Sequence, residues 1–268
     1  MSETMQSRLS LYSELIRLNR PIGILLLLWP GLWALWIAGE GQPPWWIVLL
    51  FIAGTALMRS AGCAINDYAD RDLDGHVQRT SARPLASGRV APREALMVAA
   101  VLALAAFLLV LLLNQKTILM SFVAVTLAAL YPFMKRHTHM PQLVLGMAFG
   151  WAIPMAFTAL TNQVPVVAWV LFAATVIWAL IYDTMYAMVD RSDDLKIGIK
   201  SSAILFGRHD RLIIGLLQLV MLVLLFWAGL LAGRGEWFWL GLGSAALLFL
   251  YQQWLIRERD PGACFKGF

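Results

Sequence analysis

Eight long apolar segments, nearly free of charged residues, recur along the 268-residue chain and constrain its fold more than any other feature. Each is close to the roughly 20 residues that a helix needs to cross a lipid bilayer. Backbone N–H and C=O groups inside lipid must pair within their own segment, so we expect all eight to be helices. The segments are Pro21–Ala38, Trp46–Ile65, Ala95–Leu113, Ile118–Met134, Gln142–Leu160, Val166–Tyr182, Leu212–Ala232 and Trp237–Ile256.

The amino-acid composition leaves no room for a water-soluble domain beside these segments. Apolar residues make up 60% of the chain and charged residues 14%, whereas a soluble domain has about 45–50% and about 25%. We therefore predict an all-α, polytopic transmembrane helical bundle that forms a single domain over residues 1–268. Residues 1–20 are expected to form an N-terminal interfacial segment.

The charged residues gather on one side of this predicted bundle. If Arg59, near the end of the second segment, is counted with the loop that follows it, all but two of the 21 lysines and arginines lie in alternate loops, and the acidic residues follow the same pattern. The positive-inside rule places these loops in the cytoplasm. The net charge of +5 is then mostly a topology signal and does not indicate a nucleic-acid partner. The acidic residues need another explanation, because they contribute little to orientation.

Many of these acids form two motifs, which begin where the second and the sixth apolar segments end. Residues three or four apart share a helical face, so each motif predicts a polar stripe if its helix continues past the apolar segment. The first stripe comprises Asn66, Asp70 and Asp74, with Asp67 beside them, and the second comprises Asp183, Tyr186, Asp190 and Asp194. Asp72 is expected to point away from the first stripe.

A bound divalent cation explains why these carboxylates stand together. Like charges four residues apart destabilise a helix by a few tenths of a kcal/mol per pair, and a cation offsets that cost. An all-oxygen ligand set favours Mg²⁺ or Mn²⁺, and Mg²⁺ commonly bridges carboxylates to phosphate oxygens.

One motif alone could be a solvated acidic loop. Both motifs, however, end spans that are four apart and lead into similar tails, which suggests a pseudo-repeat of four-helix units. The predicted metal ligands are Asn66, Asp67, Asp70, Asp74, Asp183, Asp190 and Asp194.

Basic and aromatic residues near the stripes are candidates for binding a diphosphate. Arginine forks and lysine point charges suit phosphate oxygens, and tyrosine hydroxyls need polar partners. Each basic residue could instead serve only as a topology signal. Four glycines, at positions 54, 62, 146 and 150, are expected to allow close helix packing. The diphosphate candidates are Arg79, Arg83, Lys135, Lys196, Lys200, Tyr131 and Tyr186.

The two motifs, NDxxDxxxD at 66–74 and DxxYAxxDxxxD at 183–194, resemble the paired signatures of the UbiA superfamily of intramembrane prenyltransferases. Stretches 25–30, 75–80, 83–88, 131–136, 150–156 and 196–207 are similar to its 4-hydroxybenzoate polyprenyltransferase branch. The resemblance implies a bundle around a central cavity in a bacterial-type inner membrane, with the active site facing the cytoplasm. It also implies Mg²⁺-dependent transfer of a polyprenyl group to the ring carbon ortho to the hydroxyl of 4-hydroxybenzoate, in ubiquinone synthesis. Asp70, Asp74, Asp190 and Asp194 would be the catalytic residues.

The partners expected from this reading are polyprenyl diphosphate, 4-hydroxybenzoate and membrane lipid, without an obligatory protein partner. A buried acceptor carboxylate needs a positively charged partner. The candidates near the membrane boundary are Arg20, Arg59 and Arg136. Members of the branch usually continue past a stretch like 263–268 with a ninth apolar helix. We expect a chain without that helix to have one cavity wall open.

Other readings differ in substrate or in reaction class. Naphthoate or homogentisate could replace 4-hydroxybenzoate as the acceptor. A CDP-alcohol phosphotransferase motif is echoed by Asp74, Gly75 and Gly88, but Pro92 and Leu96 stand where its later aspartates belong. An ion-coupled transporter would place its acids near the bilayer midplane, on broken helices, whereas these acids lie at span ends.

Overall fold

The computed structural model describes residues 3–75 and 80–267, and every regular element in this part of the chain is helical. The α-helices are α1 (Glu3–Leu15), α2 (Ile22–Ala38), α3 (Trp45–Asp74), α4 (Pro92–Val110), α5 (Gln115–His137), α6 (Pro141–Gly150), α7 (Ala152–Thr161), α8 (Val166–Ile197), α9 (Ser202–Phe206), α10 (Asp210–Leu231), α11 (Glu236–Leu255) and α12 (Pro261–Gly267). Two short 3₁₀ helices, η1 (Gly207–His209) and η2 (Ile256–Glu258), precede α10 and follow α11.

All eight apolar segments are helical, which confirms the membrane-bundle prediction, but seven helical stretches of the described chain rather than eight are long enough to cross a membrane. The exception is α2, which has 17 residues. Pro21 and Gly39 flank it and set its length, since proline favours a helix start and glycine a helix end.

One predicted span, Gln142–Leu160, is divided into α6 and α7, which meet at Trp151. Pro154 has no N–H to donate to the carbonyl of Gly150, four residues earlier, so the helical ladder is interrupted there. The two pieces together still form a 21-residue apolar stretch. The sequence pattern therefore located the span correctly and missed the interruption inside it.

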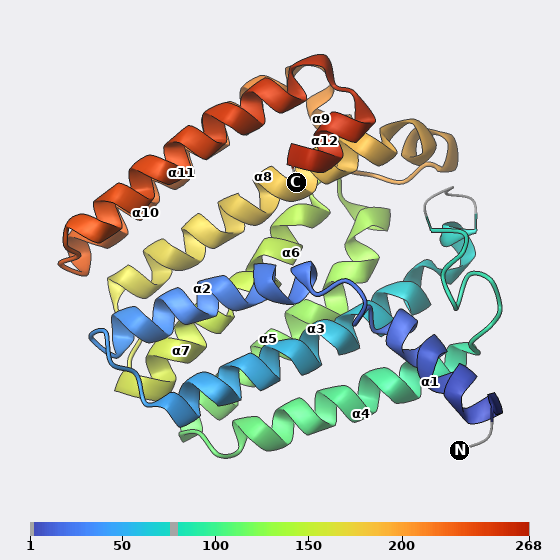
Figure 1. Ribbon diagram of the computed structural model, residues 1–268, viewed down its shortest axis with the longest axis horizontal. Coiled ribbons are helices and arrows are strands. Elements are labelled where there is room, and N and C mark those ends of the chain that lie inside the picture. The colour runs from blue at the N-terminus through green and yellow to red at the C-terminus, as the bar shows by residue number, and fades with distance from the viewer. Residues whose placement is uncertain (1–2, 76–79, 268) are drawn as a thin grey trace.

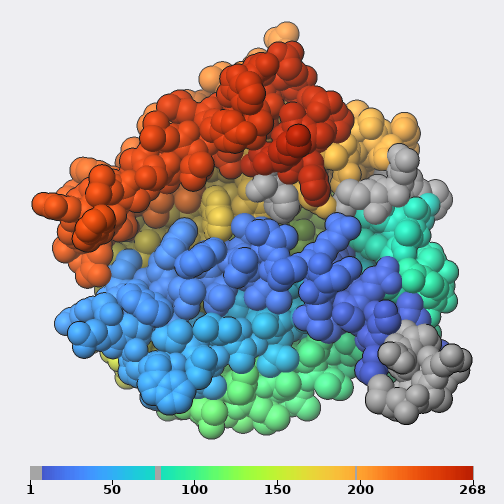
Figure 2. Space-filling model, in the orientation of Figure 1, coloured from blue at the N-terminus to red at the C-terminus, as the bar shows by residue number. Residues whose placement is uncertain are grey.

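Helix α8 runs through the middle of the bundle, between α2 on one side and the α10–α11 pair on the other (Figure 1). It packs most extensively against α6 and α10, while α3 packs along α4. Gly146 of α6 faces the α8 backbone, because a Cβ built at that position would lie 2.9 Å from Val176 Cα. The surface is hollowed between α2 and the α10–α11 pair, with α8 at the floor of the hollow (Figure 2).

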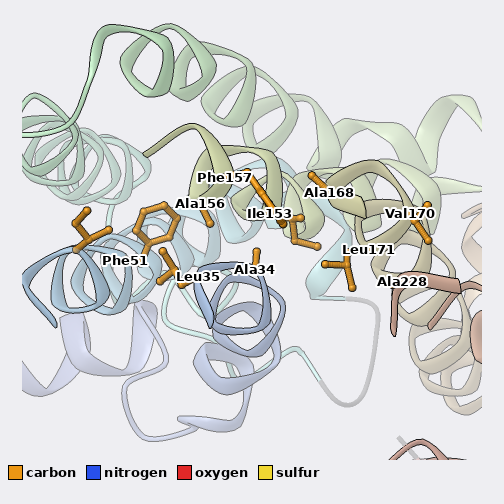
Figure 3. Packing of buried hydrophobic residues seen from close by; sticks show 11 residues of the cluster. Ala34, Leu35, Phe51, Ile153, Ala156, Phe157, Ala168, Val170, Leu171 and Ala228 are labelled. Carbon is orange, nitrogen blue, oxygen red and sulfur yellow. The ribbon is translucent and has the colours of Figure 1, made fainter. Parts of the chain in front are cut away.

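Buried apolar side chains form three clusters. The first joins α2, α3, α7, α8 and α10, and includes Leu35, Phe51 and Ile153 (Figure 3). The second surrounds the later half of α8 and includes Cys264 of α12. The third holds α1 against α3 and the start of α4 through the fully buried Leu15. The interfacial placement of residues 1–20 stays a prediction.

Candidate active site

The two acidic motifs face one cavity of about 1000 Å³. As predicted, α3 stays helical to Asp74 and α8 continues to Ile197, so each motif forms a stripe on one helical face. Asp72, by contrast, is exposed to solvent, with 72% of its side-chain surface accessible. The stripe residues that line the cavity are Asn66, Asp67, Asp70 and Asp74 from α3 and Asp183, Tyr186, Asp190 and Asp194 from α8.

The carboxylates of the first stripe are paired with cationic side chains. Arg83 donates from Nη1 to Asp67 Oδ1 at 3.1 Å and to Asp74 Oδ2 at 2.8 Å. The ammonium group of Lys135 donates to Asp70 Oδ2. These contacts place Arg83 and Lys135 at the stripe and offset the mutual repulsion of its acids, while their role in binding a diphosphate stays a prediction.

Arg17 is a cavity residue that the sequence analysis missed. It occupies the turn between α1 and α2 with a left-handed backbone, φ +56°, and its Nη2 lies 2.5 Å from Asp67 Oδ1. Burial lowers the pKa of Arg17, but the Asp67 carboxylate, together with smaller contributions from Cys63 and Tyr186, raises it by more, so the net pKa is raised and the group stays charged. The only feature of the sequence that pointed to a role for Arg17 in the cavity is its position shortly before Arg20, close to the first span.

The second stripe is joined to the rest of the site by its tail and by α12. The backbone N–H of Lys200 donates to the Lys135 carbonyl at 3.2 Å, which ties the tail of the second motif to the end of α5. The Tyr186 ring lies 6.0 Å from that of Phe265, centroid to centroid. Phe265 also lines the cavity, as Lys200 and Tyr131 do, and nothing in the motifs pointed to it.

Two of the predicted residues that the structure describes are not among those that line the cavity. Lys196 is exposed and pairs with Asp193 at 3.0 Å. The Arg136 guanidinium donates to the backbone carbonyl of Ala69, within the first motif. Arg79 lies outside the described residues.

Two of the arginines predicted to bind an acceptor, Arg20 and Arg59, line the cavity. Arg59 Nη1 donates to the carbonyls of Ile16, at 3.0 Å, and Arg17, at 3.3 Å. Its guanidinium can occupy this place because Gly23 has no side chain, since a Cβ there would lie 2.5 Å from Arg59 Nη2. The α1–α2 turn and the start of α2 thus hold Arg59 at the charged part of the cavity.

The remaining wall of the cavity is largely apolar. It is formed by side chains from α2 to α7, which lie along the spans rather than at the motifs. A long hydrocarbon group would find apolar surface here and charged groups at the stripes. Among these residues are Leu26, Leu27, Leu50, Phe51, Leu104, Phe107, Phe122, Val125, Leu145 and Phe149.

The donor set at the stripes suits a hard divalent cation. It consists of carboxylate and amide oxygens, which Mg²⁺ prefers. Asp70 Oδ1 is buried and has no hydrogen-bond partner among the described residues, so one oxygen of this carboxylate is available to a ligand. No three acidic, histidine or cysteine side chains of the described chain are close enough together to form a metal site as they stand.

The sequence pattern of the UbiA prenyltransferase family matches residues 27–268. The chain belongs to this family. Two UbiA relatives with high identity are each named 4-hydroxybenzoate octaprenyltransferase. The protein of Alkalilimnicola ehrlichii is 63% identical over 257 residues, which cover 96% of this chain and 88% of the relative. That of Nitrosococcus oceani is 60% identical over 264 residues, which cover 98% and 93%.

Solved UbiA structures share the fold of this chain. The apo structure of a UbiA homolog from Aeropyrum pernix K1 has a TM-score of 0.78 at 24% identity, over 91% of this chain and 96% of that one. A UbiA homolog from Archaeoglobus fulgidus, bound to GPP and Mg²⁺, has a TM-score of 0.74 at 20% identity, over 93% and 88%. The helical bundle predicted from the sequence is therefore the UbiA fold.

Proposed function

We propose that this UbiA enzyme transfers a polyprenyl group from polyprenyl diphosphate to 4-hydroxybenzoate, at the ring carbon ortho to the hydroxyl, and releases diphosphate. The observation that carries the proposal is a single cavity in which two acidic stripes meet a long apolar wall. Relatives about 60% identical over nearly the whole chain carry the corresponding name. The charged end of the bundle faces the cytoplasm of a bacterial-type inner membrane, as the distribution of basic residues indicates.

The residues at the stripes bind the diphosphate end of the donor. Asp70, Asp74, Asp190 and Asp194, with Asn66, Asp67 and Asp183, would hold Mg²⁺. When bound, Mg²⁺ neutralises negative charge on the diphosphate and so makes it a better leaving group.

The cationic side chains complete this site. Arg83, Lys135, Lys200 and Arg17 place positive charge where the leaving group gains negative charge. The hydroxyls of Tyr131 and Tyr186 are further polar groups within this part of the cavity.

The acceptor reacts where the charged and apolar parts of the cavity meet. Arg20 and Arg59 bind its carboxylate and so orient the ring. The allylic C–O bond breaks, the electron pair leaves with the diphosphate, and the ring carbon forms the new C–C bond. The ring proton then passes to a nearby carboxylate or to the departing diphosphate. The apolar wall keeps water from quenching the allylic cation.

The proposal is tested with membranes that contain the chain, supplied with a polyprenyl diphosphate, 4-hydroxybenzoate and Mg²⁺, with products identified by mass. Asp70→Asn and Asp190→Asn should lower turnover by at least about a hundredfold, since each removes a charge that serves the leaving group. Asp72→Asn is the matched control and should retain activity, because Asp72 belongs to the same motif but points into solvent.

Two results would contradict this assignment. One is normal turnover by both stripe variants or in excess EDTA. The other is a preference for naphthoate or homogentisate when the acceptors are offered together, which would leave prenyl transfer in place but change the substrate.

A further inference from the structure

A second and smaller cavity lies between α10 and α11, at the same charged end of the bundle. Its volume is about 500 Å³, and it shares no lining residue with the reaction cavity. We propose that this groove binds the headgroup of an anionic phospholipid. The groove is lined by Arg208, Arg211, Leu212, Gly215, Leu216, Gln253 and Arg259.

A buried carboxylate fixes the frame of the groove. Asp210 is fully buried and accepts hydrogen bonds from Arg259 Nε at 3.0 Å and from Arg191 Nη2 at 2.6 Å. Arg259 Nη2 also donates to the carbonyl of Arg208 at 2.8 Å. These bonds link η1, the start of α10 and the segment after η2, so the groove is preorganised.

The groove carries more positive charge than Asp210 can balance. Three guanidinium groups line it, and Arg191 already shares the only carboxylate that pairs with them among the described residues. Arg211 donates from Nη1 to the Arg257 carbonyl at 3.1 Å, while its buried Nε has no partner in the described chain. The Arg208 guanidinium likewise forms no ion pair within the described residues. Arginine N–H groups of this kind suit phosphate oxygens.

Apolar surface continues from the guanidinium groups along α10. Leu212 and Leu216 lie on the same helical face and are more than half exposed, and Gly215 between them leaves that face open toward Gln253. On a membrane-spanning helix such exposed leucines contact lipid. Trp254, the residue of α11 that follows Gln253 in the sequence, is exposed, and tryptophans in such positions are typical of the headgroup level. The phosphate of a lipid would contact the guanidinium groups, and its acyl chains would lie along Leu212 and Leu216.

The occupant that fits both halves of the groove is therefore a phospholipid of net negative charge. A free phosphate would satisfy the arginines but leave the leucine surface unused. A zwitterionic lipid would bring its own cation toward the guanidinium groups. The groove would bind this lipid whether or not the larger cavity catalyses prenyl transfer.

The test measures lipid retained by the purified full chain after gel filtration from micelles that contain phosphatidylglycerol or phosphatidylcholine. Each arginine near an anionic surface strengthens binding by about fivefold, so Arg208→Gln/Arg211→Gln should weaken phosphatidylglycerol binding by about thirtyfold. Arg257→Gln is the matched control and should bind normally. Its guanidinium lies outside the groove, against Glu258 and the Trp254 ring. Gly215→Phe, which fills the groove and keeps every charge, should also lower retention.

Three outcomes would overturn the proposal. The double arginine variant could retain as much phosphatidylglycerol as the wild type. Phosphatidylcholine could be retained equally well, which would indicate a nonspecific lipid shell. Glycerol phosphate could displace phosphatidylglycerol at comparable concentration, which would make the acyl chains irrelevant.

Discussion

Gly23→Ala should disturb acceptor binding without replacing any charged residue. An alanine Cβ at this position would lie 2.5 Å from Arg59 Nη2, 2.8 Å from Nε and 3.0 Å from Cζ. Ordinary van der Waals contact begins at 3.4 Å, so the guanidinium must move by about 1 Å. The helix itself can stay in place, because the atoms that clash belong to the end of a flexible side chain.

The size of the effect follows from the bonds that Arg59 makes. A shift of this size breaks or bends its hydrogen bonds to the Ile16 and Arg17 carbonyls, now 3.0 and 3.3 Å long. Hydrogen bonds to charged groups contribute about 1.5–3 kcal/mol each. The lower part of that range applies, because Arg59 is only half-buried and water can replace part of the loss. We expect the KM for 4-hydroxybenzoate to rise by about tenfold to a hundredfold, with little change in the KM for the prenyl donor.

Initial rates measured against 4-hydroxybenzoate at saturating prenyl diphosphate give this result directly. Gly241→Ala is the control, because a Cβ there meets nothing within 4 Å. A double-mutant cycle with Arg59→Gln makes the test sharper. If Gly23→Ala acts only through Arg59, it should add nothing to the effect of Arg59→Gln. An unchanged acceptor KM in Gly23→Ala, or fully additive effects in the cycle, would refute the role given to Arg59.

Two further predictions concern stability. Gly146→Ala should lower the free energy of unfolding by about 1–3 kcal/mol, seen as a lower thermal midpoint in detergent. The new Cβ would lie 2.9 Å from the Val176 backbone, which cannot move aside as a side chain can. An unchanged midpoint would show that α6 and α8 can separate freely. Asp210→Asn should cost about 3–5 kcal/mol, since it leaves two guanidinium groups without their buried carboxylate. Thermal inactivation compared with that of Glu258→Gln, an exposed site, measures the effect, and equal midpoints would contradict it.

The sequence predicted the helices well because each rests on a strong local signal. Length and apolarity identify spans even without knowledge of their neighbours. Packing partners carry no such signal. Gly146 and Gly150 allow close helix packing, as expected, and the helix they meet is α8, but a Cβ at Gly54 or Gly62 would meet nothing within 4 Å, and both of these glycines line the cavity. A small residue permits close approach, and the sequence does not say whether a helix or a cavity takes the space.

The site was predictable to the extent that it repeats along a helix. The spacing of the aspartates placed both stripes, since helical geometry fixes which side chains share a face. The groups that meet the stripes come from turns and from distant segments. Arg17 reaches Asp67 only because of its left-handed turn, and Phe265 reaches Tyr186 from the far end of the described chain. Neither contact follows a helical period.

The ion pairs of the first stripe bear on whether the protein must bind its metal before it can fold. Arg17, Arg83 and Lys135 already balance the charges of Asp67, Asp70 and Asp74 inside the folded bundle. Folding in the membrane therefore need not wait for Mg²⁺. If the proposed metal-diphosphate binds here, Arg17, Arg83 and Lys135 would pair with its phosphate oxygens, and Asp67, Asp70 and Asp74 would hold the metal. Binding of the metal-diphosphate would then be an exchange of ionic partners, and the divalent metal would be needed for binding the donor but not for folding the bundle.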